Sequence, residues 1–308
     1  MEVPLTTVAP QPARTAVAAP SRSLRHTVTP LLVSVLAAAG VAVTYYTFVR
    51  TPLGQAVDTA VMSGGDVDHP RVADVLSKAL QYTHLTLLAL VCVLAAAFGV
   101  LRRRLDLSIG AAFVVGAANL TTQYLKSHLT RPDLDGLAMP NSFPSGHVTA
   151  AASVAFVLVL VFPRALRGTI GLIGAGYVTL VAIATVWAEW HRPSDAVAAL
   201  LIVLACGGVA VWAVRMRRAG APRPLQLPNM LVMAVLAVTG AVTAAAGLLG
   251  LLAVALAERG SPGFVSERFA FLTGSAGIVA CVAGTFILWV RLTADEPPAG
   301  RPNLGGTK

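Results

Sequence analysis

Residues 195–214 read DAVAALLIVLACGGVAVWAV, a run whose one charged side chain, Asp195, stands at its first position. A helix over this run is about 30 Å long, which is the thickness of the hydrocarbon core of a membrane. Arginines at 215, 217 and 218 follow the run, whereas the stretch before it, residues 190–194, reads WHRPS. The run therefore predicts a membrane-spanning helix with one basic end and one polar end that carries a histidine.

Seven further apolar runs occur along the chain. Hydrophobic residues make up 56% of the 308 residues and charged residues 12%, and the mean hydropathy is +0.74. A soluble domain of this size needs far more polar surface, so the composition excludes one. We expect an all-α polytopic membrane bundle, with a six-helix core over 29–214 and two extra C-terminal spans over 229–290. The seven runs lie at 30–49, 82–101, 108–125, 147–163, 169–189, 229–257 and 269–290.

The segments between the runs predict how the chain is oriented. Arginines gather in alternate segments, and by the positive-inside rule these segments face the cytoplasm. The net charge of +9 is spread over them and forms no single basic patch, so nucleic acid is not an expected partner. The cytoplasmic segments are then the tails 1–28 and 291–308, the loops at 102–104 and 164–167, and the linker 215–228.

Three polar segments lie at the ends of runs on the predicted outer side. They read KSHLTRPD over 126–133, PSGH over 144–147 and HRPSD over 191–195. A single lysine or arginine at the end of a span commonly reaches the head groups by snorkelling. Snorkelling does not account for two histidines, a lysine, an arginine and an aspartate on the same side of the bilayer. We therefore expect the three segments to form one site.

The second segment predicts an anion-binding helix start. Ser145 stands at the N-cap position before an apolar helix, where its side chain can accept a hydrogen bond from a free backbone N–H. We expect the amides of Ser145, Gly146 and His147 to point outward, beside the positive end of the helix dipole. Gly146 would let a phosphate approach the backbone, and Lys126 and Arg131 would add charge and directed hydrogen bonds.

The third segment predicts an oriented histidine. Pro193 suits the first turn of a helix, and the spacing of four residues lets the Asp195 carboxylate reach back to His191. Such a pair selects the imidazole tautomer and stabilises the charged ring that forms during nucleophilic attack. His147 is then available to protonate a leaving oxygen. Nothing orients His128, which we interpret as a loop histidine in contact with water.

In these motifs and their order the chain resembles the type 2 phosphatidic acid phosphatase family, the lipid phosphate phosphatases. That family carries a Lys-and-Arg-Pro segment, then Pro-Ser-Gly-His, then Ser-Arg followed by His-x-x-x-Asp; residues 144–147 match the second motif completely. The resemblance covers about residues 82–214. It implies that His191 attacks phosphorus to form a phosphohistidine with Asp195 as its partner, that His147 protonates the departing group, and that water then hydrolyses the intermediate. The residues implied to bind the phosphate oxygens are Lys126, Arg131, Ser145 and Gly146.

The chain departs from the family pattern in two places. The Ser-Arg pair of the third motif belongs seven and six residues before His191, where this chain has Ala184 and Thr185. One phosphate-binding cation of the family is therefore missing. In the first motif, the family spacing places the lysine at Tyr124 if Arg131 is the arginine before proline, so the lysine at 126 fits a shorter spacing.

Together these observations predict a metal-independent membrane lipid phosphatase with its site at the outer face of a bacterial plasma membrane. A lipid phosphate and the membrane lipids are the expected partners, no cofactor is implied, and the formation of a homo-oligomer stays open. Polyprenyl diphosphate or monophosphate, phosphatidic acid and phosphatidylglycerol phosphate all fit as substrates, and the resemblance favours the polyprenyl carriers. The altered third motif and the two extra spans leave a second function open, which is binding or transport of a lipid phosphate without turnover.

Three smaller features carry expectations of their own. The outer segment 50–81 could cap the site or bind a cation, but its turn and a weak helical pattern from Pro70 to Leu80 fit a simple loop better; its polar residues are Asp58, Asp66, Asp68, His69 and Asp74. Glu189 either pairs with Arg192 or another cation of the site, or is simply exposed at the interface. Aromatic residues near span ends predict an interfacial belt, among them Tyr45, Trp190 and Trp289.

Overall fold

The computed structural model describes residues 24–65, 70–82, 91–93, 97, 99–101, 104–137, 139–217, 229–260 and 265–294. Within these ranges the regular structure is entirely helical, which confirms the all-α fold. The elements are α1 (Leu24–Thr44), the π-helical turn η1 (Tyr45–Val49), α2 (Pro52–Ser63), α3 (Pro70–Tyr82), α5 (Leu105–His128), α6 (Gly146–Val161), α7 (Arg164–Trp187), α8 (Pro193–Arg217), α9 (Met230–Gly260) and α10 (Glu267–Ala294).

Six of the described helices are long and apolar enough to cross a membrane: α1 with η1, α5, α7, α8, α9 and α10. The apolar helix α6 is shorter, with 16 residues, because Ser145 caps its start and Phe162 ends it directly before Pro163. These helices confirm six of the expected spans, and the run 147–163 forms α6, an apolar helix shorter than the other six. The remaining one, over 82–101, falls largely outside the described residues.

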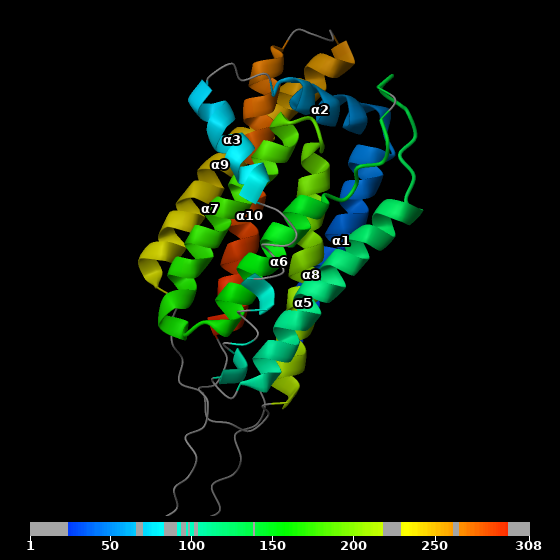
Figure 1. Cartoon of the computed structure of the whole chain (residues 1–308). Coiled ribbons are helices and arrows are strands. Elements are labelled where there is room, and N and C mark those ends of the chain that lie inside the picture. The colour runs from blue at the N-terminus through cyan, green and yellow to red at the C-terminus, as the bar shows by residue number, and fades with distance from the viewer. Residues whose placement is uncertain are drawn as a thin grey trace, which may run out of the picture.

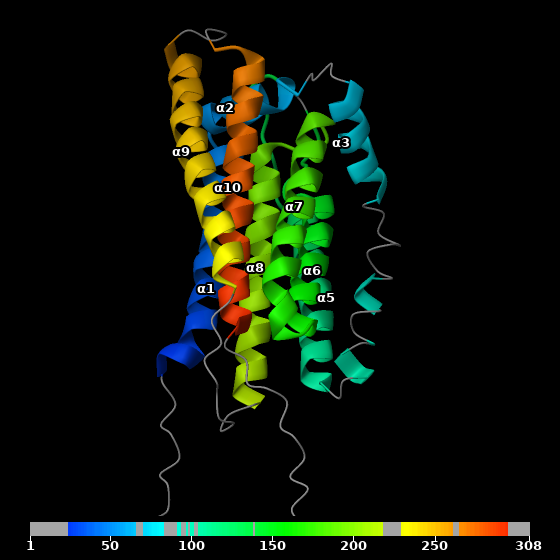
Figure 2. The same ribbon diagram turned by 90° about the vertical axis from the view of Figure 1, so that its left-hand side faces the viewer.

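The helices alternate in direction, so the chain returns repeatedly to the same two ends of the bundle (Figures 1 and 2). Helix α8 lies at the centre and packs against α1, α5, α6 and α10. The described part of the chain starts in α1 and finishes in α10 at one end. At the other end α5 finishes and α6 and α8 begin; we call this the site end.

The segment 50–81 differs from the expected loop. Residues 52–63 form α2, which lies across the site end of the bundle (Figure 1). Thr51 is its N-cap, accepting a hydrogen bond from Gly54 N at 3.1 Å, and Pro52 occupies the first turn. This start signal was present in the sequence, but the helix is too short to stand out as a span. The helical pattern expected from Pro70 is confirmed by α3.

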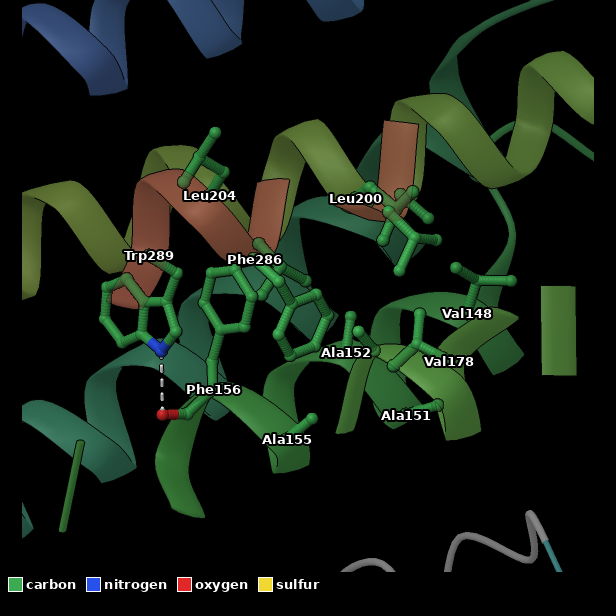
Figure 3. Close-up of a cluster of buried hydrophobic side chains, with 14 of the residues drawn as sticks. Val148, Ala151, Ala152, Ala155, Phe156, Val178, Leu200, Leu204, Phe286 and Trp289 are labelled. Carbon is green, nitrogen blue, oxygen red and sulfur yellow. Dashed lines mark hydrogen bonds between the residues drawn. The ribbon is translucent and has the colours of Figure 1, made fainter. Parts of the chain in front are cut away.

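Helix α10 is built into the core rather than attached to its outside. Trp289 is fully buried, and its indole stacks on Phe156 of α6 with ring centroids 4.4 Å apart. The indole N–H donates to the carbonyl of Phe156 at 3.1 Å, and Phe286 packs beside the pair (Figure 3). Trp289 is therefore a core residue, and its assignment to an interfacial belt is wrong.

Two buried arginines hold the far end of α10. Arg167 of α7 donates to the carbonyl of Thr293, and Arg215 of α8 donates to the carbonyl of Leu292 at 2.7 Å. Both carbonyls belong to the last turn of α10, where cations complement the helix dipole. The sequence marks these arginines only as topology signals, yet they tie α10 to the core.

Replacing Trp289 with alanine is expected to destabilise the fold by about 3 kcal/mol, because a large buried ring and its hydrogen bond are lost. Thermal unfolding of the purified protein in detergent measures the effect. The matched control is Leu288→Ala, one residue earlier, because Leu288 is 41% exposed on the outside of the bundle. Equal melting temperatures for the two variants would contradict the role assigned to α10.

Candidate active site

The residues expected to form a site meet at the site end of the bundle. They come from the end of α5, the segment 129–145, the start of α6, the turn 188–192 and the start of α8. Direct hydrogen bonds join Arg131, His191 and Asp195, and the ring of His147 lies beside that of His191. The fold therefore brings the three polar segments of the sequence together.

Asp195 is the hub of this site, and its side chain is fully buried. Arg131 Nη2 donates to its Oδ1 at 2.7 Å, and the Ser142 hydroxyl donates to its Oδ2 at 2.5 Å. The backbone N–H of Arg192 donates to Oδ2 at 3.1 Å, and His191 Nδ1 lies 3.3 Å from the same oxygen. Four donors therefore converge on one carboxylate and satisfy its lone pairs away from water.

The start of α8 explains why Asp195 reaches this place. Pro193 is the first helical residue, as expected, so Arg192 stands at the N-cap and Asp195 at the third position of the first turn. An acidic side chain at that position can reach back to the N-cap backbone N–H, which is one half of a capping box. The same carboxylate thus caps the helix and orients the imidazole of His191.

His191 is held so that one ring nitrogen is left for a substrate. Its backbone N–H donates to the carbonyl of Thr185 at 3.1 Å, and its side chain is 6% exposed. With Nδ1 as the donor to Asp195, Nε2 is unprotonated and can act as a nucleophile. The ring centroids of His147 and His191 are 6.2 Å apart, and Trp190 flanks His147 at 5.4 Å. A tetrahedral phosphoryl group between the two imidazoles can reach both at hydrogen-bonding distances of about 3 Å.

Arg131 is fixed by neighbours that the sequence did not identify. The Tyr45 hydroxyl donates to the carbonyl of Thr130 at 2.7 Å, and Gln55 Nε2 donates to the carbonyl of Pro132 at 2.7 Å. The Arg131 side chain is 3% exposed, yet its Nε and Nη1 have no hydrogen-bond partner among the described residues. A buried guanidinium with two unused donors is a strong site for an anion.

The start of α6 differs from the expectation in one respect. The Ser145 side chain accepts a hydrogen bond from Val148 N at 3.4 Å, which confirms Ser145 as the N-cap. Its backbone N–H, however, donates to the carbonyl of Asp195 at 3.0 Å, so the expectation that this amide is free is wrong. The amide is used in this contact between α6 and α8 and does not point into the site. A Cβ added at Gly146 would meet only Gln123 Nε2, at 3.8 Å, so the space in front of this glycine is open.

Lys126 lies in the last turn of α5 and is half-buried. Its ammonium is within electrostatic reach of Asp195. Asn141 fixes the backbone here, because its amide donates to the carbonyls of Lys126 at 3.2 Å and Leu129 at 2.9 Å. His128 is exposed and its ring stacks on Tyr124, as expected for a histidine outside the site.

Neither Thr185 nor Arg192 takes the place of the arginine that the third motif lacks. Thr185 is fully buried and its hydroxyl donates to the carbonyl of Ala182 at 2.9 Å. Arg192 is fully buried too, but it points away from the imidazoles: Nε donates to the Thr59 hydroxyl at 3.0 Å and Nη2 to Asp135 at 3.3 Å. Glu189 is exposed with a left-handed φ of 57°, so the alternative in which it pairs with Arg192 is wrong.

Asp135 is the partner that Arg192 uses instead. Burial alone would raise the pKa of Asp135, but the Thr59 hydroxyl, the Leu137 amide and the charge of Arg192 outweigh it and hold this pKa below its usual range. Three segments that are distant in the sequence meet in this cluster.

Three polar residues at the site, Ser142, Gln55 and Thr59, were not singled out by the sequence, and Asp58 was considered only as one of the acids of the outer segment 50–81. Ser142 contacts Asp195 directly, whereas Gln55, Asp58 and Thr59 of α2 contact the segments on either side. Besides the helix start at Thr51 and Pro52, the local signal for α2 is the spacing of Gln55, Asp58 and Thr59 at i, i+3 and i+4, which places them on one helix face. Within the described ranges, no three His, Cys, Asp or Glu side chains lie close enough together to hold a metal ion.

Comparison with known proteins gives one result. Residues 108–219 match the model of the PAP2 superfamily, a range that runs from α5 to the end of α8 and contains every catalytic and phosphate-binding residue expected from the sequence. No curated protein and no solved structure matches significantly. Residues 108–219, which carry the three motif segments joined around Asp195 in a bundle of membrane-spanning helices, are thus similar to the PAP2 superfamily.

Proposed function

We propose that this protein is a membrane lipid phosphatase that works through a phosphohistidine intermediate. The observation that carries the proposal is the arrangement around Asp195. One buried carboxylate orients His191 and also holds Arg131, whose remaining donors have no partner among the described residues. A nucleophile and an anion-binding group are thereby fixed by the same side chain.

In the first chemical step, Nε2 of His191 attacks phosphorus. The bond between phosphorus and the lipid oxygen breaks, its electron pair stays on that oxygen, and His147 donates a proton to it. Asp195 stabilises the imidazolium that develops on His191. In the second step a water molecule attacks the phosphohistidine, His147 accepts its proton, and inorganic phosphate leaves. Both steps use only protein side chains and water, so the scheme requires no metal ion.

Four groups are suited to hold the phosphoryl oxygens. Arg131 offers Nε and Nη1, Lys126 offers a compact charge at the end of α5, and the backbone at Gly146 leaves room beside the helix start. Ser145 contributes its hydroxyl and the rigid position of the helix start, because its amide is already used. With one arginine of the family pattern missing, we expect weaker stabilisation of the transition state than a site with both arginines provides.

The membrane-spanning helices support a lipid phosphate as the substrate class. We place the site at the outer face of a bacterial plasma membrane, because the arginine-rich segments follow the positive-inside rule with the tails in the cytoplasm. Polyprenyl monophosphate or diphosphate and phosphatidic acid are the compounds to test first.

The test is phosphate release by the purified protein in detergent with excess EDTA, using a panel of these lipids. Turnover is expected without added metal, and acid-labile, base-stable 32P is expected on the protein after rapid quenching. Release that requires a divalent metal would overturn the scheme. Saturable binding of a lipid phosphate with no release would instead favour the second function, binding or transport without turnover, for which the missing third-motif arginine is the supporting observation.

A further inference from the structure

The N-cap residue of α8, Arg192, has no side-chain acceptor for the free amides of the first turn, although Asp195 accepts the N–H of Arg192 itself. Pro193 has no N–H, and the amide of Asp195 donates to the carbonyl of Arg192 at 3.0 Å. The amide of Ser194 then remains as a free donor of the first turn. An N-cap residue normally accepts this bond through its side chain, but arginine at the N-cap has no acceptor.

Asp58 of α2 supplies the missing acceptor. Its Oδ1 accepts the backbone N–H of Ser194 at 3.1 Å, and its Oδ2 accepts the Ser194 hydroxyl. Asp58 is 2% exposed, so this contact is made away from water. A carboxylate at this place also complements the positive end of the helix dipole.

The neighbouring residues on the same face of α2 bind Arg192 and the segment that follows Arg131. Thr59 binds the side chain of Arg192, and Gln55 accepts the amide of Leu134 at 3.1 Å and donates to the carbonyl of Pro132. One helix face therefore fixes both the start of α8 and the segment that carries Arg131.

We infer that Asp58 is a positioning residue for the reaction: it caps α8 from another helix and thereby fixes His191 and Asp195 relative to Arg131. The inference rests on the proposed function for its effect on turnover. Asp58 lies outside residues 108–219, so nothing in the family match assigns it a role. A displacement of about 1 Å at a reacting group can lower a rate about 100-fold.

The pH dependence of stability reports on the burial of Asp58 independently of activity. Burial, and next the charge of Asp195, raise the pKa of Asp58 from 3.8 to about 7, while Ser194 and the charge of Arg131 lower it. The folded protein therefore binds an extra proton between about pH 4 and pH 7. The resulting stabilisation is complete below pH 4 and is lost as the pH rises through 7. Asp58→Asn removes this component, so its melting temperature should rise relative to wild type between pH 5 and pH 8.

The deciding experiment compares Asp58→Ala, Asp58→Asn and the control Val57→Ala in the full-length protein. Val57 is equally buried on α2 but makes no polar contact with α8. For Asp58→Ala we expect kcat to fall about 30- to 100-fold with KM nearly unchanged, and amide exchange at the start of α8 to accelerate at least about tenfold. Asp58→Asn keeps an acceptor for the Ser194 amide, so its kcat and its rate of amide exchange at the start of α8 should lie close to the wild-type values. Val57→Ala should lower only the melting temperature.

The outcomes separate the inference from the proposed function. A wild-type protein without turnover would reject the phosphatase, while amide exchange in Asp58→Ala would still decide whether Asp58 caps α8. Wild-type turnover with normal kcat and normal exchange in Asp58→Ala would overturn the inference alone. Equal effects of Val57→Ala and Asp58→Ala on kcat and on exchange would also overturn it, because the effect would then be general loosening of α2.

Discussion

His191→Ala is expected to lower kcat by about 10⁴-fold or more, the scale of loss when a covalent nucleophile is removed. The physical reason is that Nε2 of His191 is the nitrogen left free by the bond from Nδ1 to Asp195. The measurements are steady-state phosphate release and 32P labelling of the protein, and both should vanish in the variant.

The matched control is His128→Ala. His128 lies near the same end of the bundle, but it is exposed, stacked on Tyr124 and bonded to Ser127. This variant should keep kcat within about threefold of wild type, since exposed side chains outside the site have small effects. Phosphohistidine that persists in His191→Ala, or that disappears in His128→Ala, would show that the nucleophile is a different histidine.

Asp195→Asn is expected to lower kcat by about 10³- to 10⁴-fold, because an asparagine can present its amide to the histidine and select the wrong tautomer. It also leaves the buried guanidinium of Arg131 without a counter-charge, which costs about 3 kcal/mol of folding stability. Both losses should appear in one variant: kcat in the phosphate assay and the melting temperature in detergent. The folded state is therefore checked first, by thermal unfolding.

Asp133→Asn is the control for this substitution. Asp133 is exposed in the segment that carries Arg131 and only accepts a hydrogen bond from the amide of Gly136, at 2.9 Å. Asparagine makes the same turn contact, so activity and melting temperature should stay near wild type. An Asp195→Asn protein that is as active as Asp133→Asn would remove the basis for assigning His191 as the nucleophile.

Much of the fold can be predicted from the sequence, because the membrane limits the backbone conformations that can cross it. Every backbone polar group in hydrocarbon must be paired within its own segment, so an apolar run of sufficient length can only be a helix. Seven of the eight runs form helices in the described part of the chain, and six of these helices are long enough to span a membrane. What apolar runs do not encode is which helix packs on which: the burial of Trp289 against Phe156 follows from shape and contact rather than from hydrophobicity.

The candidate site also has some features that the sequence predicts and others that depend on contacts between helices. The spacing from His191 to Asp195 and the cap at Ser145 are local, because a helix fixes where residues three or four apart must lie. The amide of Ser145 could not be assigned from the sequence, because its acceptor lies on α8. Glu189 and Arg192 are neighbours in the chain, yet the left-handed turn at Glu189 and the presence of Asp135 separate them.

The sequence alone thus determined the helical membrane class, the three motif segments and their presence on the same side, since all of these depend on local composition and helical period. Only the tertiary structure decided that Arg131 shares Asp195 with His191, and that Asp58 of α2 contacts the start of α8. These are contacts between side chains that are 64 and 136 residues apart. Their formation depends on how whole helices pack, which no short stretch of the chain specifies.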